Sequence, residues 1–302
     1  MAKIVPNVHR IHTTYKGRNL YQHIIERNGR MLLVDTGAPD TPESLLFPYM
    51  EEHGLHPSAI GAIIVTHADY DHRGGTIAIK RRAPEALLIA QKQELEPLRA
   101  IEGMPAIDVT FDGELRFGFP SGMRNDNIPV HLYHAPGHSA GHLIVHLPLQ
   151  RTAIITDAAL GEWIPDVGGE PSLPPIYFDA EAYLRTIEKI RGLDAEVLMA
   201  SHFPLIAGKE QVAGFLDGSR DFVYRVESYL LEKLERADGF LDIPALILQS
   251  RGRLGRWKEE ADQALQACFH AGLHRLKERG AVAQAPGGKG WSLRRTDLNA
   301  LR

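Results

Sequence analysis

Short apolar runs bounded by turn residues recur along the first two hundred residues. Residues 62–65 and 87–90 are continuous apolar, largely β-branched or aliphatic runs, which predict buried strands. Residues 4–13 alternate loosely and predict a first strand. Asn28-Gly29 separates two apolar runs within residues 21–34 and predicts a β-hairpin. Further strands are expected at residues 110–111, 117–119, 128–134, 143–147, 152–156 and 196–200.

A helical period appears between these strands. Tyr183, Leu184, Ile187 and Ile190 share the spacing of one helix face, and Asp179 is placed to cap that helix. Thr41-Pro42 predicts another helix start, with Thr41 as the N-cap, and this helix ends near Gly54. Two more helices are expected, one from Gly75 through Arg82 and one over residues 93–101. Strands interleaved with helices predict sheets covered by helices.

The pattern changes beyond about residue 210. Helices are expected over residues 212–237, 243–249, 257–269 and 272–279, and Pro286–Gly290 then separates two short apolar runs, which indicates a hairpin. We therefore expect a first domain over residues 1–210 and a small, mainly α, winged-helix-like domain over residues 211–302. The second domain either contacts nucleic acid through its last helix and Lys289 or serves as a packing or dimerisation appendage; we favour the appendage.

Composition indicates an ordinary globular protein. The 302 residues are 44% hydrophobic and 24% charged, long enough for two domains. No stretch reaches the ~18 apolar residues of a membrane span, and the first residues do not resemble a signal peptide. The single cysteine, Cys268, excludes an internal disulfide framework and a multi-cysteine zinc site. We expect a cytoplasmic protein whose metal ligands are histidines and carboxylates.

Charge is unevenly distributed. Residues 238–302 carry eleven Lys and Arg against seven Asp and Glu, whereas residues 1–237 carry 23 against 31. The acidic larger part argues against a general nucleic-acid binder, and the mildly basic C-terminal part keeps that function open.

The segment Thr66–Gly75 concentrates the chemistry. After the strand at residues 62–65, four potential metal ligands fall within six residues: His67, Asp69, Asp71 and His72. Two carboxylates and two imidazoles at one strand end are costly to bring together unless cations bind there. The alternative is a solvated polar loop with helix-capping aspartates. We favour a metal site because of the ligand density.

This segment resembles the His-x-His-x-Asp-His signature of the metallo-β-lactamase fold superfamily, with Asp69 where the family usually has its second histidine. Four further motifs of that family follow the expected order: Leu32–Gly37, Ala135–His142, Ile154–Asp157 and Met199–His202. The resemblance covers roughly residues 4 to 210. It implies an α+β fold, an αββα sandwich of two mixed β-sheets with outer helices.

The resemblance also implies roles for individual residues. His67, Asp69 and His138 would hold one divalent metal ion, Asp71, His72 and His202 a second, and Asp157 would bridge them. Two ions, Zn²⁺ in the first instance, would share a hydroxide that acts as the nucleophile. Asp71 and Asp157 are the candidate catalytic residues. Two further side chains, Asp35 and His142, would orient ligands by hydrogen bonding.

The aspartate at position 69 changes the expected chemistry. Three carboxylates and a hydroxide balance two dications, so we expect a less acidic metal-bound water than the family pattern has. The harder ligand set would also accept Mn²⁺ or Fe²⁺ more readily. The alternative is that Asp69 does not coordinate, which leaves one metal at Asp71, His72 and His202.

The segment 160–178 follows the bridging aspartate and is rich in proline and glycine. Its Trp163, Tyr177 and Phe178, with Phe203, would line an apolar mouth above the metals or else cover a helix. An apolar mouth favours hydrolysis of a neutral small-molecule carboxylic ester, lactone or thioester over that of a highly charged phosphate. The alternative functions are a nuclease or phosphodiesterase acting on RNA or DNA, and a non-enzymatic binding or redox protein with a di-iron site.

Overall fold

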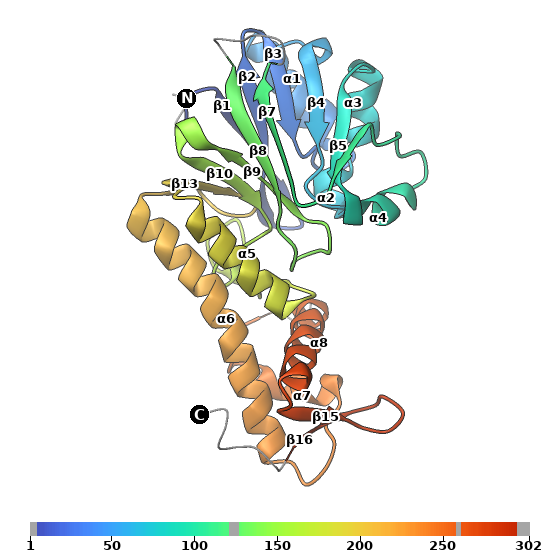
Figure 1. The fold of residues 1–302 in the computed structure, drawn as a ribbon, viewed down its shortest axis with the longest axis vertical. Coiled ribbons are helices and arrows are strands. Elements are labelled where there is room, and N and C mark those ends of the chain that lie inside the picture. Colours follow the sequence, from blue (N-terminus) through green and yellow to red (C-terminus); the bar gives the residue numbers. More distant parts are fainter. Residues whose placement is uncertain (1–4, 121–126, 258–260, 295–302) are drawn as a thin grey trace.

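Two six-stranded β-sheets pack face to face in the computed structural model, which describes residues 5–120, 127–257 and 261–294 (Figure 1). The first sheet has the strand order β1-β2-β3-β4-β5-β6. Strands β1 to β3 form an antiparallel meander, and β3 to β6 are parallel. The strands are β1 (Val8–Tyr15), β2 (Arg18–Arg27), β3 (Arg30–Val34), β4 (Ile60–Ile64), β5 (Leu87–Gln91) and β6 (Val109–Phe111).

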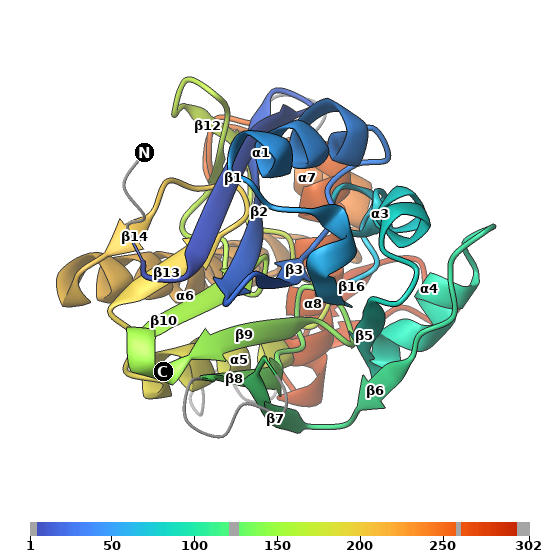
Figure 2. The same cartoon turned by 90° about the horizontal axis from the view of Figure 1, so that it is seen from above.

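The second sheet has the order β14-β13-β10-β9-β8-β7 and is antiparallel except where β10 pairs with β13. The short connection between β6 and β7 carries the chain from the edge of one sheet to the edge of the other (Figure 2). The strands are β7 (Glu114–Phe119), β8 (Ile128–His134), β9 (Leu143–Leu147), β10 (Thr152–Thr156), β13 (Val197–Ala200) and β14 (Ile206–Ala207).

Successive side chains along the strands of the first sheet point to opposite faces and so contribute to two separate hydrophobic layers. Leu32 and Ile64 lie between the sheets with Val130 and Ile154, and all are almost fully buried. Their chain neighbours, among them Leu33, point to the opposite face of the first sheet and pack under helices. Those helices are α1 (Phe47–Glu52), preceded by a π-helical turn at Pro42–Leu46, α3 (Thr76–Arg82) and α4 (Leu95–Arg99).

The outer face of the second sheet is covered by α5 (Ala180–Gly192) and α6 (Lys209–Glu235). Helix α6 continues past the sheets and packs against α8, with α7 and a short hairpin beside them (Figure 1). One apolar cluster includes Ile155 of the sheet, Ile187 of α5, Leu230 of α6 and Phe269 of α8. The last elements are α7 (Ile243–Ser250), α8 (Asp262–Glu278), β15 (Val282–Gln284) and β16 (Trp291–Leu293).

The predicted α+β arrangement of mixed sheets with outer helices is confirmed. The division after residue 210 stays a prediction. Among the described helices, none is long and apolar enough to cross a membrane.

Several predicted boundaries differ from the structure. The two helices expected at 257–269 and 272–279 are largely one continuous helix, α8, while residues 258–260 lie outside the described residues. Gly272 does not break α8 because it packs against α6, where an added Cβ would meet Leu230 Cδ1 at 3.2 Å. The Thr41 side chain makes no capping hydrogen bond. It is buried instead under Gly37, where a Cβ would clash with it.

Candidate metal centre

The predicted site residues converge because their strands end at the same edge of the sandwich. In the first sheet, β3 and β4 are parallel, and they are followed by Asp35 and by the segment that begins at Thr66. In the second sheet, β10 and β13 are parallel and lead to Asp157 and His202. The backbone N–H of Leu143 donates to the carbonyl oxygen of Thr66 at 3.0 Å and joins the two sheets at this edge.

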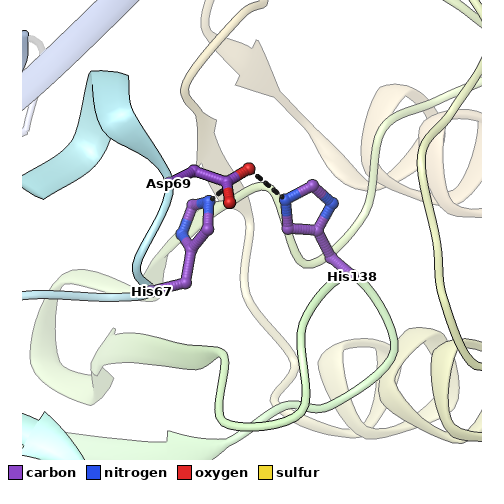
Figure 3. Close-up of side chains that lie close together, drawn as sticks. All are labelled: His67, Asp69 and His138. Atoms are coloured by element: carbon purple, nitrogen blue, oxygen red, sulfur yellow. Dashed lines mark hydrogen bonds and ion pairs between the residues drawn. The ribbon is translucent and has the colours of Figure 1, made fainter. Parts of the chain in front are cut away.

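One group of ligand atoms comes from His67, Asp69 and His138 (Figure 3). Asp69 Oδ2 lies 3.6 Å from His67 Nε2 and 3.3 Å from His138 Nε2. Both imidazoles are buried, whereas the Asp69 side chain is 56% exposed and reaches over them from the cleft side. A carboxylate and two imidazoles at these distances form a donor set for a divalent cation.

A second group comes from Asp71, His72 and His202, whose ligand atoms lie within 4.8 Å of one another. Asp157 lies between the groups. Its Oδ2 is 3.3 Å from His202 Nε2, 3.5 Å from His72 Nε2 and 3.8 Å from His138 Nε2. The structure therefore brings together all seven predicted side chains, and Asp157 takes the central position.

Each imidazole of the cluster is oriented through its other ring nitrogen. His72 Nδ1 donates to Asp35 Oδ2 at 2.7 Å. The Thr66 hydroxyl donates to the same carboxylate at 2.8 Å and accepts from His67 Nδ1 at 3.0 Å. The remaining two rings donate to carbonyl oxygens, His138 Nδ1 to Ile176 and His202 Nδ1 to Asn19. All four Nε2 atoms are thereby left to face the centre as ligand atoms.

Three buried atoms at the centre make no hydrogen bond with any described residue: His67 Nε2, His72 Nε2 and Asp157 Oδ1. Leaving a buried polar atom unpaired costs roughly 1–3 kcal/mol. Nitrogen and oxygen donors that converge on one point and lack partners are what a divalent cation would satisfy. The residues present therefore fit a metal.

The electrostatics of the cluster point the same way. Burial acts to raise the pKa of Asp157, but the His202 and His72 imidazoles outweigh it and hold that pKa well below its usual range. Burial acts to lower the pKa of His138, but the Asp69 and Asp157 carboxylates raise it to about 9. The cluster therefore attracts positive charge, which protons or metal ions can provide.

His142 lies beside the cluster. Its ring centroid is 4.7 Å from that of His67, and its Nε2 is 3.0 Å from the Thr156 hydroxyl. Burial, followed by the charges of His67 and His138, holds the pKa of His142 well below its usual range. A neutral ring in this position supports the ligand side chains by packing and hydrogen bonding.

Sequence reasoning missed Glu94, which ties the two ligand loops together. This carboxylate is 2% exposed. It accepts from the backbone N–H of Ala68 and Gly141, both at 3.0 Å, and from the Ser139 hydroxyl. A lone glutamate at the start of a predicted helix carries no signal of such a role, because the contacts join segments 26 and 47 residues away along the chain.

A cleft of about 250 Å³ opens onto the cluster, and it is not lined by the aromatic residues that we expected. Tyr177 is fully buried and stacks on Tyr183, with ring centroids 5.1 Å apart. Phe203 packs on Phe215. Trp163 and Phe178 line two other cavities. Of the two alternatives, the aromatic mouth is therefore wrong, and Tyr177 and Phe203 pack against helices α5 and α6 in the outer core of the second sheet.

The cleft is instead walled by residues from three segments. Tyr70 lies within the ligand segment, between Asp69 and Asp71, and stacks on Tyr15, with ring centroids 6.2 Å apart. A two-stranded ribbon, β11 (Ile164–Pro165) and β12 (Pro171–Leu173), comes from the segment 160–178. The lining residues apart from the cluster are Tyr15, Lys16, Arg18, Tyr70, Ile164, Leu173 and Ile176.

Comparison with known proteins gives a consistent result. A family model described as the metallo-beta-lactamase superfamily matches residues 20–202. The "Beta-lactamase-like protein 2 homolog" of Caenorhabditis elegans is 26% identical over 201 residues, which are 64% of this chain. The matched region spans 58% of that relative, less than two thirds of its length.

Solved structures share the fold at low sequence identity. A metallo-beta-lactamase family protein from Thermus thermophilus is similar with a TM-score of 0.73 and 19% identity, over 96% of this chain and 100% of its own. A beta-lactamase domain protein from Burkholderia ambifaria has a TM-score of 0.73 and 14% identity, over 97% of this chain and 93% of its own. The sec-alkylsulfatase Pisa1 from a Pseudomonas species has a TM-score of 0.63 and 17% identity, over 88% of this chain and 49% of its own. These likenesses concern the fold alone.

Proposed function

Because the chain belongs to the metallo-beta-lactamase superfamily, we propose that it hydrolyses a small-molecule carboxylic ester, lactone or thioester. Members of this superfamily are metal-dependent hydrolases, and this chain is one. The observation that carries the substrate class is the cleft over the ligand cluster, which holds about 250 Å³ and has Ile164, Leu173 and Ile176 in its wall. A small cleft with an aliphatic wall suits an acyl group better than a nucleic-acid strand.

Two divalent ions, Zn²⁺ in the first instance, are the proposed cofactors. His67, Asp69 and His138 would hold one, Asp71, His72 and His202 the other, and Asp157 would contact both. Support comes from the three buried atoms without partners and from the 3.3 Å separation of Asp69 Oδ2 and His138 Nε2. That short separation favours coordination by Asp69 over a single site at Asp71, His72 and His202. With three carboxylates in the set, Mn²⁺ or Fe²⁺ would also be accepted.

When bound, such ions activate water and polarise the scissile carbonyl. The protein side chains position the reactants. Asp35 keeps the proton of His72 on Nδ1, so that Nε2 remains a donor. Asp71 lines the cleft and is the carboxylate placed to accept a proton from the attacking water. The aliphatic residues of the wall exclude competing water from the acyl group.

We further propose that residues 1–210 are the catalytic domain and that residues 211–302 are a winged-helix-like packing domain. The order of α6, α7, α8 and the β15–β16 hairpin supports the second assignment. Two of its arginines are used internally: Arg275 of α8 pairs with Glu227 and Glu181, and Arg253, in the turn after α7, pairs with Glu232. Cations already paired in this way contribute little to a nucleic-acid surface.

Metal analysis followed by a substrate panel tests the proposal. The purified protein would be assayed with thioester, lactone, aryl ester and phosphodiester substrates, with and without a chelator. We expect turnover of carboxylic esters or thioesters that the chelator abolishes and Zn²⁺ restores. Chelator-sensitive cleavage of RNA or DNA without acyl hydrolysis would contradict the proposal and support a nuclease.

A further inference from the structure

Two cations, Lys16 and Arg18, lie at the rim of the cleft that opens onto the ligand cluster. They belong to the tight turn between β1 and β2, where Tyr15 pairs with Arg18 and two residues connect them. Lys16 and Gly17 both have positive φ, 47° and 73°, as a two-residue hairpin turn requires. The turn thus places two positive charges side by side on the same short segment.

This turn is anchored where it meets the cleft. The backbone N–H of Val167 donates to the carbonyl oxygen of Gly17 at 3.0 Å and connects the turn to the β11–β12 ribbon. Tyr15 stacks on Tyr70, which lies within the ligand segment. The two cations are therefore held on a fixed rim, although their side chains are partly or largely exposed.

Three ligand carboxylates line the same cleft as these two cations, but none of them pairs directly with either cation in the described part of the chain. Among the described residues, neither Lys16 nor Arg18 forms an ion pair, and Lys16 Nζ only approaches the Tyr15 ring, 5.3 Å from its centroid. Two exposed arginines elsewhere do form ion pairs, Arg82 with Glu43 at 3.1 Å and Arg116 with Glu114 at 2.9 Å. Two like charges on neighbouring positions repel each other, and a bound anion would relieve that repulsion.

We propose that Lys16 and Arg18 bind a carboxylate of the substrate, so that the enzyme prefers anionic acyl thioesters or esters to neutral ones. The inference rests on the proposed hydrolase function and narrows its substrate class. The cations, the ligand cluster and the aliphatic wall share one cleft of about 250 Å³. A molecule that reaches all three is small and has its carboxylate only a few bonds from the scissile carbonyl. Arginine and lysine provide the charge-assisted hydrogen bonds that a carboxylate accepts.

Matched thioesters test the charge preference. The probes are the glutaryl and pentanoyl thioesters of N-acetylcysteamine, which differ mainly in the terminal carboxylate. The variants are Lys16→Asn, which suits the left-handed turn, Arg18→Gln and the double variant. The control, Arg30→Gln, removes an exposed cation from the turn at the opposite end of β2.

We expect each substitution to lower kcat/KM for the glutaryl thioester about 10-fold, mainly through KM, because each removes one charge-assisted contact worth roughly a factor of ten. For the pentanoyl thioester, kcat/KM should stay within about twofold of the wild-type value. Arg30→Gln should leave kcat/KM unchanged for both thioesters. Arg18→Lys should recover part of the kcat/KM for the glutaryl thioester that Arg18→Gln loses. A parallel fall for both thioesters, or no fall for the glutaryl thioester, would overturn the proposal. The pentanoyl thioester of 3-mercaptopropionate carries its anion on the leaving group; if it alone responds, the acyl-side assignment is wrong.

A binding measurement separates this proposal from the function on which it rests. The probe is 4-oxopentanoate, a carboxylate with a ketone in place of the ester, titrated into the zinc-loaded protein and followed by NMR. If the protein hydrolyses no acyl substrate, the proposed function fails. Weaker binding to the double variant than to wild type would still support the anion site. Equal binding to wild type and to the double variant would overturn the anion site. The proposal would also be overturned if Lys16 and Arg18 were needed for oligoribonucleotide cleavage and not for hydrolysis of the thioesters.

Discussion

Asp35 shows how one buried carboxylate can organise a metal site without facing the cleft. Its backbone has φ of 58°, a conformation that aspartate and asparagine adopt more readily than most residues. One carboxylate oxygen accepts from the Thr66 backbone N–H at 2.9 Å, and the other accepts from the Thr66 hydroxyl and from His72 Nδ1. The negative charge on Asp35 thereby fixes both the orientation and the tautomer of His72.

Replacing Asp35 with asparagine tests this role with little change in shape. Asparagine tolerates the left-handed backbone, but it is neutral and provides only one acceptor oxygen. We expect Asp35→Asn to weaken zinc binding about 10- to 100-fold, the usual effect of losing such a partner of a ligating histidine. Competition with a chromophoric chelator measures the affinity. Asp40→Asn, at an exposed position, is the control and should bind zinc like wild type.

His146 gives a pH dependence that is separate from the ligand cluster. Burial, with a smaller contribution from the neighbouring His131, lowers the pKa of His146 from 6.5 to about 4. The ring therefore stays neutral in the folded protein at pH values where the unfolded chain takes up a proton. Stability from this residue is complete above about pH 6.5 and is lost as the pH falls toward 4.

His146→Gln should remove this contribution. We expect the free energy of unfolding of wild type to fall on the order of 1 kcal/mol more than that of the variant between pH 7 and pH 5, after allowing for solvent screening. Urea unfolding of both proteins at the same zinc loading measures the difference, since other titrating groups then cancel. If the free energy of unfolding had the same pH dependence in wild type and in the variant, His146 would be protonated equally in the folded and unfolded states.

Between elements, Glu94 joins the loop that carries His67 and Asp69 to the loop that carries His138. Glu94→Gln replaces an acceptor by an amide nitrogen that faces a donor, so at least one N–H or hydroxyl loses its partner. A buried donor without a partner costs roughly 1–3 kcal/mol, so we expect a destabilisation of this size together with weaker zinc binding. Thermal unfolding and zinc titration measure the two effects.

The matched control for this change is Glu96→Gln two residues later. Glu96 is exposed and, within the described ranges, pairs only with Arg99, at 3.6 Å on the same helix. Such a pair contributes well under about 1 kcal/mol. Loss of stability without any change in zinc affinity in Glu94→Gln would show that Glu94 supports the fold but does not hold the ligand loops together.

The elements that could be predicted from the sequence are those whose signals are local. The Asn28-Gly29 hairpin, the Asp179 cap and the apolar strands all depend on residues a few positions apart, and the structure contains each of them. Four of the seven clustered side chains stand out as a dense group of ligands after one strand, and the resemblance to the family implies the other three. The cleft wall could not be predicted, because Tyr177 and Phe203 look like any exposed aromatic until the packing of α5 and α6 is known.

Glycines illustrate the same limit. Gly74 and Gly75 stand where a helix was predicted to begin, yet neither has positive φ. Their actual role is close packing, since a Cβ on Gly74 would meet Pro39 Cδ at 2.6 Å and one on Gly75 would meet the Thr36 carbonyl oxygen at 2.4 Å. Contacts of this kind involve segments about 35 residues away in sequence and leave no local pattern.

Across the whole molecule, Arg275 connects helix α8 to helices α5 and α6. From α8 its guanidinium contacts Glu227 of α6 at 2.6 Å and Glu181 of α5 at 2.6 Å. The Glu227 side chain is only 7% exposed. Arg275→Met would leave this carboxylate buried without its main partner, which typically costs about 3–5 kcal/mol. Urea unfolding measures the loss.

Two further variants show whether the buried charge is the cause. The double variant Arg275→Met with Glu227→Gln should recover part of the stability, because no unpaired charge remains. Arg185→Met removes an exposed arginine that pairs with Glu181 at 3.5 Å and should cost little. If the double variant is as unstable as the sum of its single changes, the pair contributes through packing and not through charge.

The accessibility of the single cysteine, Cys268, can be used to test whether helix α8 is coupled to the candidate metal centre. Cys268 Sγ on α8 donates to the carbonyl oxygen of Pro175 at 2.9 Å, and the next carbonyl along the chain, that of Ile176, accepts from His138 Nδ1. Burial raises the pKa of the Cys268 thiol to about 12, so the folded protein contains almost no reactive thiolate at pH 8. Labelling by a disulfide reagent therefore requires α8 to separate from the segment around Pro175.

Zinc should slow that labelling, because ligation holds His138 and so the Ile176 carbonyl next to Pro175. We expect the labelling rate at pH 8 to fall on zinc loading and to rise in Arg275→Met, by about tenfold for each 1.4 kcal/mol of change in the opening free energy. Cys268→Ser, which should show no labelling, gives the reagent background. A rate that does not depend on zinc but rises in Arg275→Met would mean that α8 opens independently of the site. In that case the chain of contacts from Cys268 to His138 would not couple the two parts of the molecule.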